Sequence, residues 1–583
     1  MHRVDAGHYA AELSITLAEG ECTVSVSYPD AGLTAAATTF IDRTNPSVEV
    51  RLSRPPSRLA ADGGVNEVDP EMPGAFRRDE SVTVTVDSPD PDLAGAIISV
   101  AGGNSFYADA GCLSRFDGGS CLEHRLDLWN QPMFAFHQTV AFEVRARDSV
   151  SNATSTDGGR VDVTRHKWRR EVPGIIDSFA LKRGGDLIAH VVSPSSVTSW
   201  NAAGALRWSV ASTATDGRLM LGDQQGEARI YLTEVKPIGE LGISVLGSND
   251  PATAPVAGLF PGVAGVFSGG LGAPVLVSKN DEIAYFPVRH GDALSLFAWN
   301  RGTGATSSAD AGQHPGTHLV VNATTDNRHI FVPMPRNNLS GNAGAFVFTF
   351  PFATGAPPEL VERVAQPAEV TSVVPRTEQL RLFAISDGGR PSQVNATGEG
   401  FVSLPLAVAA PVVGPNQYFF NESRAPAPLA PTLCELRFGA TTPTCVNVKS
   451  YGGAPVLGAP AGTRRTLYVP TMDDVSTQMG HRVTAINTTT LMPEWSTPLS
   501  VNGVLARPVS LDCSRDSGGG KLAGRPGVLY TTASIAGASP ATILTAIIVD
   551  SPGVDGDAPW PMEKHDPRNT NNLTTPLGEF SCP

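Results

Sequence analysis

A short strand with an aromatic or apolar residue at its centre recurs along most of the sequence, and it limits the possible folds more than any other feature. The central residues are Ile188, Tyr231, Tyr285, Phe331, Phe383, Phe419, Tyr468 and Tyr530. The seven intervals between them average about 49 residues, which is long enough for one four-stranded antiparallel unit. Such a period predicts a repeat architecture in which each unit buries its apolar face against the next one.

The segments around this strand recur as well. A strand such as GAPVLVSKND precedes it, and a strand with a shared ending follows it at 197–208, 295–305 and 484–495. This order resembles, in degenerate form, the blade signature of PQQ-like β-propellers. Segment 558–572, APWPMEKHDPRNTNN, resembles the segment that such propellers carry at a chain end. The resemblance implies a PQQ-like propeller over residues 173–583, with eight or alternatively seven blades.

The same resemblance implies a structural role for several tryptophans. Trp208 and Trp495 fall at the end of the blade signature, whereas Trp200 and Trp299 lie earlier in their strands. Trp560 belongs to the chain-end segment. Packing between neighbouring blades is the role expected of these side chains.

The first 165 residues alternate apolar and polar residues in short runs between turns, as strands with one buried face do. Residues 1–46 resemble the closing half of a bacterial immunoglobulin-like repeat, with a "TF-x-ID" strand and a "TNP" exit. Residues 47–165 predict a complete immunoglobulin-like β-sandwich. The expected fold is therefore all-β, with sandwiches followed by a propeller. This order, joined by "VTR-x-KW", is similar to that of secreted or lipid-anchored surface proteins of myxobacteria.

Three aspartates near one turn, Asp87, Asp90 and Asp92, are candidate calcium ligands. The spacing and the glycine of an EF-hand loop are absent, so a solvated turn is expected instead. The sequence predicts neither a metal nor a cofactor.

The charge of the chain bears on its partners. With a formal net charge of −14 and no dense Lys/Arg cluster, nucleic acid is not expected as a partner. The basic run HKWRR, 166–170, is expected to be a solvated joint between domains. No window approaches 18 apolar residues, so no membrane span is expected, and the N-terminus lacks the pattern of a signal peptide.

The cysteines indicate an oxidising, extracytoplasmic compartment: the periplasm, the cell surface or the medium. Two pairs close the short polar loops CLSRFDGGSC and CELRFGATTPTC, and their spacings do not match zinc knuckles. A third pair flanks the last repeat and the tail, where a bridge would help the first and last blades to join. The expected disulfides are Cys112–Cys121, Cys434–Cys445 and Cys513–Cys582, which leaves Cys22 unpaired.

The run CSRDSGGGK, 513–521, resembles the nucleophile segment of trypsin-like proteases at Ser517. The family has glycine where this chain has Arg515, and no histidine lies in the context that the family requires. If Cys582 pairs with Cys513, His565 and Asp566 would come near Ser517, so a remote serine hydrolase stays open. A phosphate loop is excluded because Leu522 follows the lysine. The simplest interpretation is a lengthened loop between two strands.

The blade resemblance raises a second enzymatic alternative, a quinoprotein dehydrogenase with PQQ and calcium. That class holds PQQ against a disulfide between adjacent cysteines, and no two cysteines are adjacent here. The function expected is non-catalytic binding or scaffolding of a protein or glycan of the cell envelope or its surroundings. The contact loops expected are 336–344, 421–431, 472–481 and 513–521.

Overall fold

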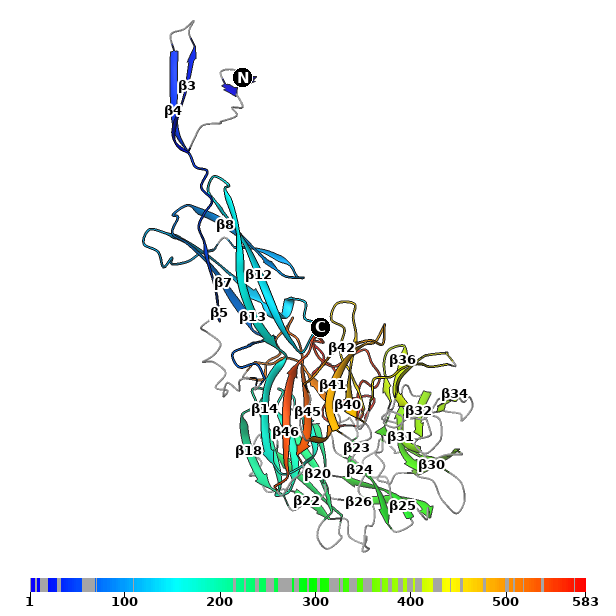
Figure 1. Ribbon diagram of the computed structural model, residues 1–583. Helices are drawn as coiled ribbons and strands as arrows, with labels where there is room; N and C mark the ends of the chain where they lie inside the picture. Colours follow the sequence, from blue (N-terminus) through cyan, green and yellow to red (C-terminus); the bar gives the residue numbers. More distant parts are fainter. Residues whose placement is uncertain are drawn as a thin grey trace. The chain divides into compact units, whose positions relative to one another are not determined.

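The computed structural model is built almost entirely of β-strands (Figure 1). It describes residues 71–108 and 110–212, most of residues 411–582 and, elsewhere, chiefly the strands given below. Within these residues the regular elements are strands and the short 3-10 helix η2 (Leu128–Asn130). The chain forms two compact units, one of Met1–Pro55, Glu80–Pro132 and Thr139–Asp162, the other of Pro56–Asp79, Met133–Gln138 and Val163–Pro583.

The first unit contains two hairpins and two larger sheets. The hairpins are β1 (His2–Asp5) with β2 (His8–Ala10), and β3 (Gly20–Tyr28) with β4 (Leu33–Ile41). One sheet has the order β10 (Ala110–Gly111), β11 (Ser120–Asp127), β7 (Ser81–Ser88), β5 (Glu49–Ser53). The other has the order β13 (Ala153–Thr164), β12 (His137–Asp148), β8 (Leu93–Val100), β9 (Ser105–Ala108). The end of β13 lies in the second unit and pairs there with β6 (Phe76–Arg77).

Each of these larger sheets has one apolar face because its residues alternate. Along β7, Val82, Val84 and Val86 are fully buried. Along β12, every second residue from Val140 to Ala146 is buried, while Glu143 and Arg145 between them are exposed. This is the period of two that the sequence shows.

The second unit is a series of four-stranded antiparallel sheets, each formed by strands that follow one another in the sequence. The first sheets are β15 (Ile176–Leu181), β16 (Leu187–Val192), β17 (Ser195–Trp200), β18 (Leu206–Ala211); β19 (Gly217–Gln224), β20 (Glu227–Val235), β21 (Leu241–Gly247), β22 (Val256–Leu259); and β23 (Val275–Leu276), β24 (Ile283–His290), β25 (Ala293–Asn300), β26 (Thr306–Gln313). Then come β27 (Thr324–Thr325), β28 (His329–Met334), β29 (Ala343–Thr349), β30 (Glu359–Gln366); and β31 (Val370–Pro375), β32 (Leu380–Ile385), β33 (Ser392–Asn395), β34 (Val402–Ser403). They are followed by β35 (Val412–Val413), β36 (Gln417–Glu422), β37 (Thr432–Arg437), β38 (Thr444–Val446); and β39 (Val456–Leu457), β40 (Thr466–Asp474), β41 (Met479–Asn487), β42 (Pro493–Ser496).

The recurring strand of the sequence is the second strand of these sheets. Its central residue is fully buried in β16 (Ile188), β20 (Tyr231), β28 (Phe331), β36 (Phe419) and β40 (Tyr468). The repeat therefore marks the position at which the second strand of each of these sheets places an apolar or aromatic side chain in the core.

The last sheet joins two distant parts of the chain. It contains β43 (Gly503–Ala506), β44 (Ser510–Asp512), β45 (Val528–Ile535) and β46 (Ala541–Ile548), and its outer strand is β14 (His166–Pro173). β14 precedes β15 in the sequence and pairs antiparallel with β46. Consecutive up-and-down sheets, the last of which is completed by a strand from before the first, are the topology of a β-propeller.

This strand corrects the expectation for HKWRR, which is not a solvated joint. Trp168 is 2% exposed, its Nε1 donates to the Ala202 carbonyl (2.9 Å), and its ring lies 5.9 Å from that of Tyr530. A Cβ on Gly204, at φ +80°, would lie 2.7 Å from the Trp168 ring, so the close approach of this ring requires a glycine at position 204. Lys167 and Arg169 lie between the buried positions of this strand, whereas His166 is itself buried and Arg170 Nε donates to the Gly204 carbonyl (2.7 Å).

Arg165, immediately before β14, is fully buried in the second unit. Its guanidinium donates to both carboxylate oxygens of Asp550 (3.0 and 2.8 Å) and to the Met133 carbonyl (2.9 Å), and it lies 4.7 Å from the Trp495 ring centre. Burial by itself would raise the pKa of Asp550, but Arg165 and Arg78 outweigh it and lower that pKa. The segment before the first sheet is therefore fixed to the segment after the last strand.

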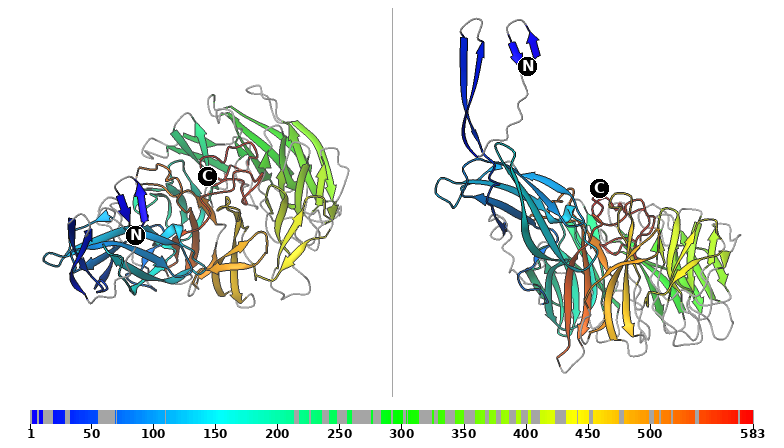
Figure 2. Two further views of the ribbon diagram at one scale, coloured as in Figure 1. Left: turned by 90° about the horizontal axis from the view of Figure 1, so that it is seen from above. Right: turned by 45° about the horizontal axis from the view of Figure 1, so that its top comes forward.

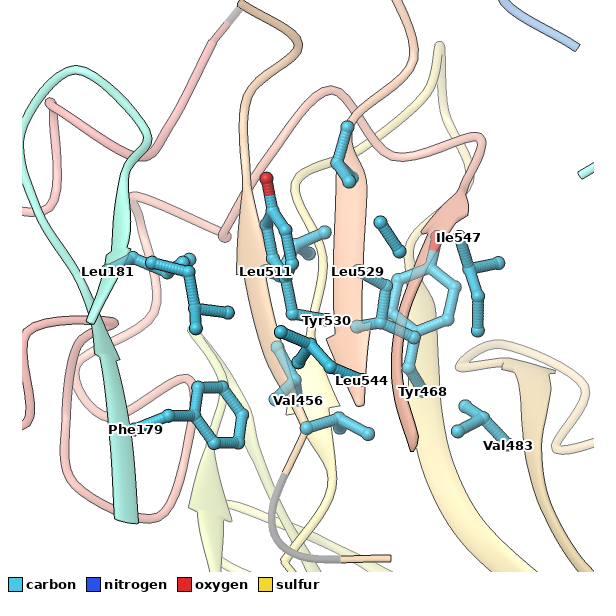
Figure 3. Packing of buried hydrophobic residues seen from close by; sticks show 14 of the residues in the cluster. Phe179, Leu181, Val456, Tyr468, Val483, Leu511, Leu529, Tyr530, Leu544 and Ile547 are labelled. Carbon is cyan, nitrogen blue, oxygen red and sulfur yellow. The ribbon is translucent and has the colours of Figure 1, made fainter. Parts of the chain in front are cut away.

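The core around the last sheets is continuous. Figure 3 shows Tyr468 and Tyr530 packed among aliphatic side chains from several strands, including Leu511, Leu529 and Leu544. Burial raises the pKa of the Tyr468 phenol, whose hydroxyl donates to Ser551 Oγ (3.0 Å). This core supports the segment that follows β46.

Candidate functional site

The tail, residues 551–582, crosses the first strands of several sheets in the second unit (Figure 2). Its backbone exchanges hydrogen bonds with one residue in each of β15, β19, β35 and β39. These bonds are Leu181 N to Pro567 O (2.7 Å), Leu221 N to Arg568 O (2.9 Å), Val413 N to Trp560 O (2.8 Å) and Leu457 N to Pro561 O (2.8 Å). First strands from widely separated parts of the sequence therefore meet at this one segment.

Side chains of the tail complete these contacts. Trp560 is fully buried, donates its Nε1 hydrogen to the Glu563 carbonyl (3.2 Å), and packs edge-on against the His565 ring. Asn569 Nδ2 donates to the carbonyls of Phe179 (2.7 Å) and Leu219 (3.1 Å), which lie in different sheets. The tail thus satisfies backbone groups at the inner strands that would otherwise need water.

The end of the tail is bound to the loop after β44. Cys582 forms a disulfide with Cys513, as expected from the sequence. Arg515, whose side chain is 1% exposed, donates to both carboxylate oxygens of Asp512 (2.8 and 3.0 Å) and to the carbonyl of Glu579 (2.9 Å). Burial raises the pKa of Asp512, and the adjacent guanidinium opposes that shift. The residue that breaks the protease pattern is thus the anchor of this loop.

Of the three residues of the possible serine hydrolase site, Ser517 lies outside the described residues, and His565 and Asp566 lie within them. Its neighbour Asp516 accepts hydrogen bonds from the backbone N–H groups of Gly518 and Gly520 (2.9 and 2.8 Å), which is a turn contact. His565 and Asp566 are buried, and His565 Nδ1 lies 3.2 Å from Asp566 Oδ2. Asp566 also accepts from the Arg568 N–H (2.8 Å) and from Thr570. Both residues thus take part in the hydrogen bonds of the buried tail.

A polar cavity of about 270 Å³ lies between the sheets β35–β38 and β39–β42. The cavity is lined by the turn before β36, the end of β37, the turn before β40 and the turn after β41. Its lining side chains are all polar, and they include Gln417, Glu435, Arg437, Thr463, Arg465 and Thr489. Gln417 and Arg437 are opposite each other in the β36–β37 ladder, which places both residues at the same end of these two strands.

The charges of the cavity are paired. Arg437 is 73% exposed, and its Nε donates to Oε1 of the buried Glu435 (3.3 Å). Arg465 Nε donates to Oδ2 of Asp555 in the tail (2.8 Å), and the carbonyl of Arg465 accepts from Thr488 Oγ1 (3.2 Å). Burial raises the pKa of Asp555, and Arg465 opposes that shift. The cavity therefore offers donors and acceptors without a large excess of either charge.

The four expected contact loops lie at two opposite ends of the strands. Segments 336–344, 421–431 and 472–481 connect second strands to third strands, and the connecting residues 335–342, 423–431 and 475–478 lie outside the described residues. Segment 513–521 connects β44 to β45, a first strand to a second. In an antiparallel sheet these two kinds of turn lie at opposite ends of the strands. The fourth loop thus lies on the side of the tail and the cavity.

The remaining predicted residues are placed as follows. Trp200, Trp299 and Trp495 are buried, and Trp208 is half-buried against an apolar cluster formed with β19 and β20. The disulfides Cys112–Cys121 and Cys434–Cys445 are present as expected, and Cys22 is free. The cavity residues were not predicted, since they lie in turns and at strand ends where no periodic pattern marks them.

Comparison with protein-family models gives no match, and comparison with curated proteins gives none. Solved structures with similarity include a streptogramin B lyase (14% identity, 52% of this chain, 94% of that chain, TM-score 0.34). Others are a virginiamycin B lyase from Staphylococcus aureus (9% identity, 65% and 98% coverage, TM-score 0.34) and a Dos1 propeller (8% identity, 70% and 88% coverage, TM-score 0.34). These TM-scores are too low to transfer function.

The assignment of the second unit as a β-propeller therefore rests on the strand order of its sheets. No helix in the described part of the chain has the length and apolar composition of a membrane span. Three disulfides indicate an oxidising environment outside the cytoplasm.

Proposed function

We propose that the protein is an extracytoplasmic binding protein in which an eight-bladed PQQ-like propeller follows immunoglobulin-like domains. The sheets of the second unit are its blades, and the last blade is closed by β14. The role is non-catalytic binding of a glycan of the cell envelope or its surroundings. The observation that supports this function is the polar cavity between the sheets β35–β38 and β39–β42.

The chemistry of the cavity favours a neutral, hydroxyl-rich ligand. Glu435 and Arg437 neutralise each other, as do Arg465 and Asp555, so a charged ligand would gain little net attraction. A sugar hydroxyl both donates and accepts hydrogen bonds, and the amide of Gln417 and the hydroxyls of the threonines can meet either need. A volume of 270 Å³ lies near the lower limit for ligand pockets, which suits one or two sugar residues.

The tail contributes to this site by holding one wall in place. Asp555 is buried, its N–H donates to the Leu457 carbonyl (3.1 Å), and its carboxylate fixes Arg465 at the cavity. The wall is therefore formed before a ligand arrives, which reduces the entropy lost on binding.

The test is a saccharide array followed by calorimetric titration of the full chain with the sugars that bind. Arg437→Gln is expected to weaken binding about 10-fold to 100-fold, since a hydrogen bond from a charged group is lost. Arg207→Gln is the matched control, because Arg207 is another exposed arginine paired with a largely buried acid, Asp186 (3.0 Å). That variant should bind like the parent protein.

Two results would overturn the proposal. One is saccharide binding that survives in Glu435→Gln and Arg437→Gln together. The other is PQQ binding with calcium-dependent oxidation of alcohols or sugars, which would replace the binding role with that of a quinoprotein dehydrogenase.

A further inference from the structure

Three carboxylates of the first unit converge from distant parts of the sequence. Asp42 follows β4, Asp92 lies in the turn before β8, and Asp148 is the last residue of β12. One carboxylate oxygen from each lies within 4.8 Å of those from the other two. Asp148 pairs with Leu93 in the β8–β12 ladder, which places it beside Asp92.

The environment of Asp148 is the second observation. The residue is 3% exposed, and its Oδ1 accepts from the N–H groups of Val150 (3.0 Å) and Asn152 (2.9 Å). Its Oδ2 is buried and has no hydrogen-bond partner among the described residues. A buried carboxylate oxygen without a donor is costly unless a cation neutralises it, and two more carboxylates nearby increase that cost.

Local contacts hold the three carboxylates in place. Asp42 Oδ1 accepts from the Thr44 N–H (2.9 Å), and Asp92 Oδ2 accepts from Ser149 Oγ (3.2 Å). Asn152 Nδ2 donates to the Asp42 carbonyl (3.0 Å), which connects the segment after β4 to the turn after β12. Within the described residues none of the three aspartates forms an ion pair with a basic side chain.

We propose that Asp42, Asp92 and Asp148 bind a calcium ion in the first unit. Three oxygen atoms that lie no more than 4.8 Å apart surround a point that is at most about 2.8 Å from each of them, so a small inward movement reaches the usual calcium–oxygen distance of about 2.4 Å. The donors are carboxylates without histidine or cysteine, which excludes a typical zinc site. Water and backbone carbonyls would supply the remaining ligands. An affinity of about 10⁻⁴ to 10⁻³ M, as in extracellular modules, would suffice outside the cytoplasm.

This site differs from the set of candidate calcium ligands in the sequence, which was Asp87, Asp90 and Asp92. Asp87 pairs with Arg51, and Asp90 Oδ2 accepts from the Ser47 N–H (2.9 Å). Only Asp92 of the three aspartates reaches the cluster. Its partners lie about 50 residues away in each direction, so spacing alone could not reveal the site.

The test is calorimetric titration of the full chain, stripped of metal, with CaCl2 and separately with MgCl2. One calcium ion should bind, and Asp148→Asn and Asp92→Asn should each weaken binding at least 10-fold. Asn at position 148 keeps an oxygen for the Val150 and Asn152 N–H groups. Asp162→Asn, an exposed aspartate on β13, is the matched control and should bind calcium normally.

The melting temperature distinguishes a calcium site from a cluster of aspartates that has only a structural role. Saturating calcium should raise the melting temperature of the first unit by about 5–10 °C in the parent protein. In EDTA, Asp148→Asn should be at least as stable as the parent, because one of three repelling charges is gone. Absence of calcium binding by the parent, unchanged binding in both variants, or tighter binding of magnesium than of calcium would each overturn the assignment.

Discussion

Replacing Cys513 and Cys582 together by serine should lower the melting temperature of the second unit by about 5 °C. The bridge closes a loop with a sequence separation of 69 residues. The chain-entropy model gives about 4 kcal/mol for a loop of this length. For a unit of roughly 450 residues the unfolding entropy is about 0.9 kcal/mol/K, and the quotient of these values is the expected shift.

The measurement is differential scanning calorimetry of the full chain without reductant. The double variant Cys112→Ser/Cys121→Ser is the control, because its disulfide lies in the first unit and its loss should not affect the second transition. An equal melting temperature of the second unit in the parent and in the Cys513/Cys582 variant would refute the reasoning. The tail would then be held by its non-covalent contacts alone.

Three further perturbations test other contacts of the second unit. Arg165→Met should destabilise it by about 3–5 kcal/mol in urea unfolding, because the largely buried Asp550 loses its main partner. Arg169→Met, on the exposed face of β14, should have little effect. Trp168→Ala should cost about 3–5 kcal/mol in the same assay, and a cost below 1 kcal/mol would show that β14 does not depend on this side chain. Since the folded-state pKa of Asp550 is lowered, its contribution to stability is complete above its unfolded pKa near 3.8 and is lost as pH falls through the lower folded value. Asp550→Asn should therefore make the free energy of unfolding fall less steeply below pH 4. An unchanged pH dependence in this range would contradict a stabilising ion pair between Asp550 and Arg165.

The periodic part of the fold could be predicted from the sequence. The second strand of each sheet must place one large residue in the core, so residues such as Tyr231, Tyr468 and Tyr530 belong to a repeat that averages about 49 residues. The disulfide pairs could be predicted as well, because hairpin-sized loops and the order of the remaining cysteines allowed few alternatives.

The closing strand and the candidate sites could not be predicted in the same way. In HKWRR, four basic residues conceal the alternation that buries Trp168. Glu435 and Arg465 meet at the cavity only because neighbouring sheets place their turns together. Such proximity depends on tertiary structure, and no spacing in the sequence encodes it.

The pairing of β14 with β46 has a consequence for biogenesis. A chain that emerges from a secretion pore N-terminus first exposes β14 long before residues 541–548 follow. Until then the edge of β14 has free backbone N–H and C=O groups and can pair with another chain. Rapid completion of export, or a chaperone that shields this edge, should therefore limit aggregation, and fragments that end before Ala541 should aggregate more readily than the full chain.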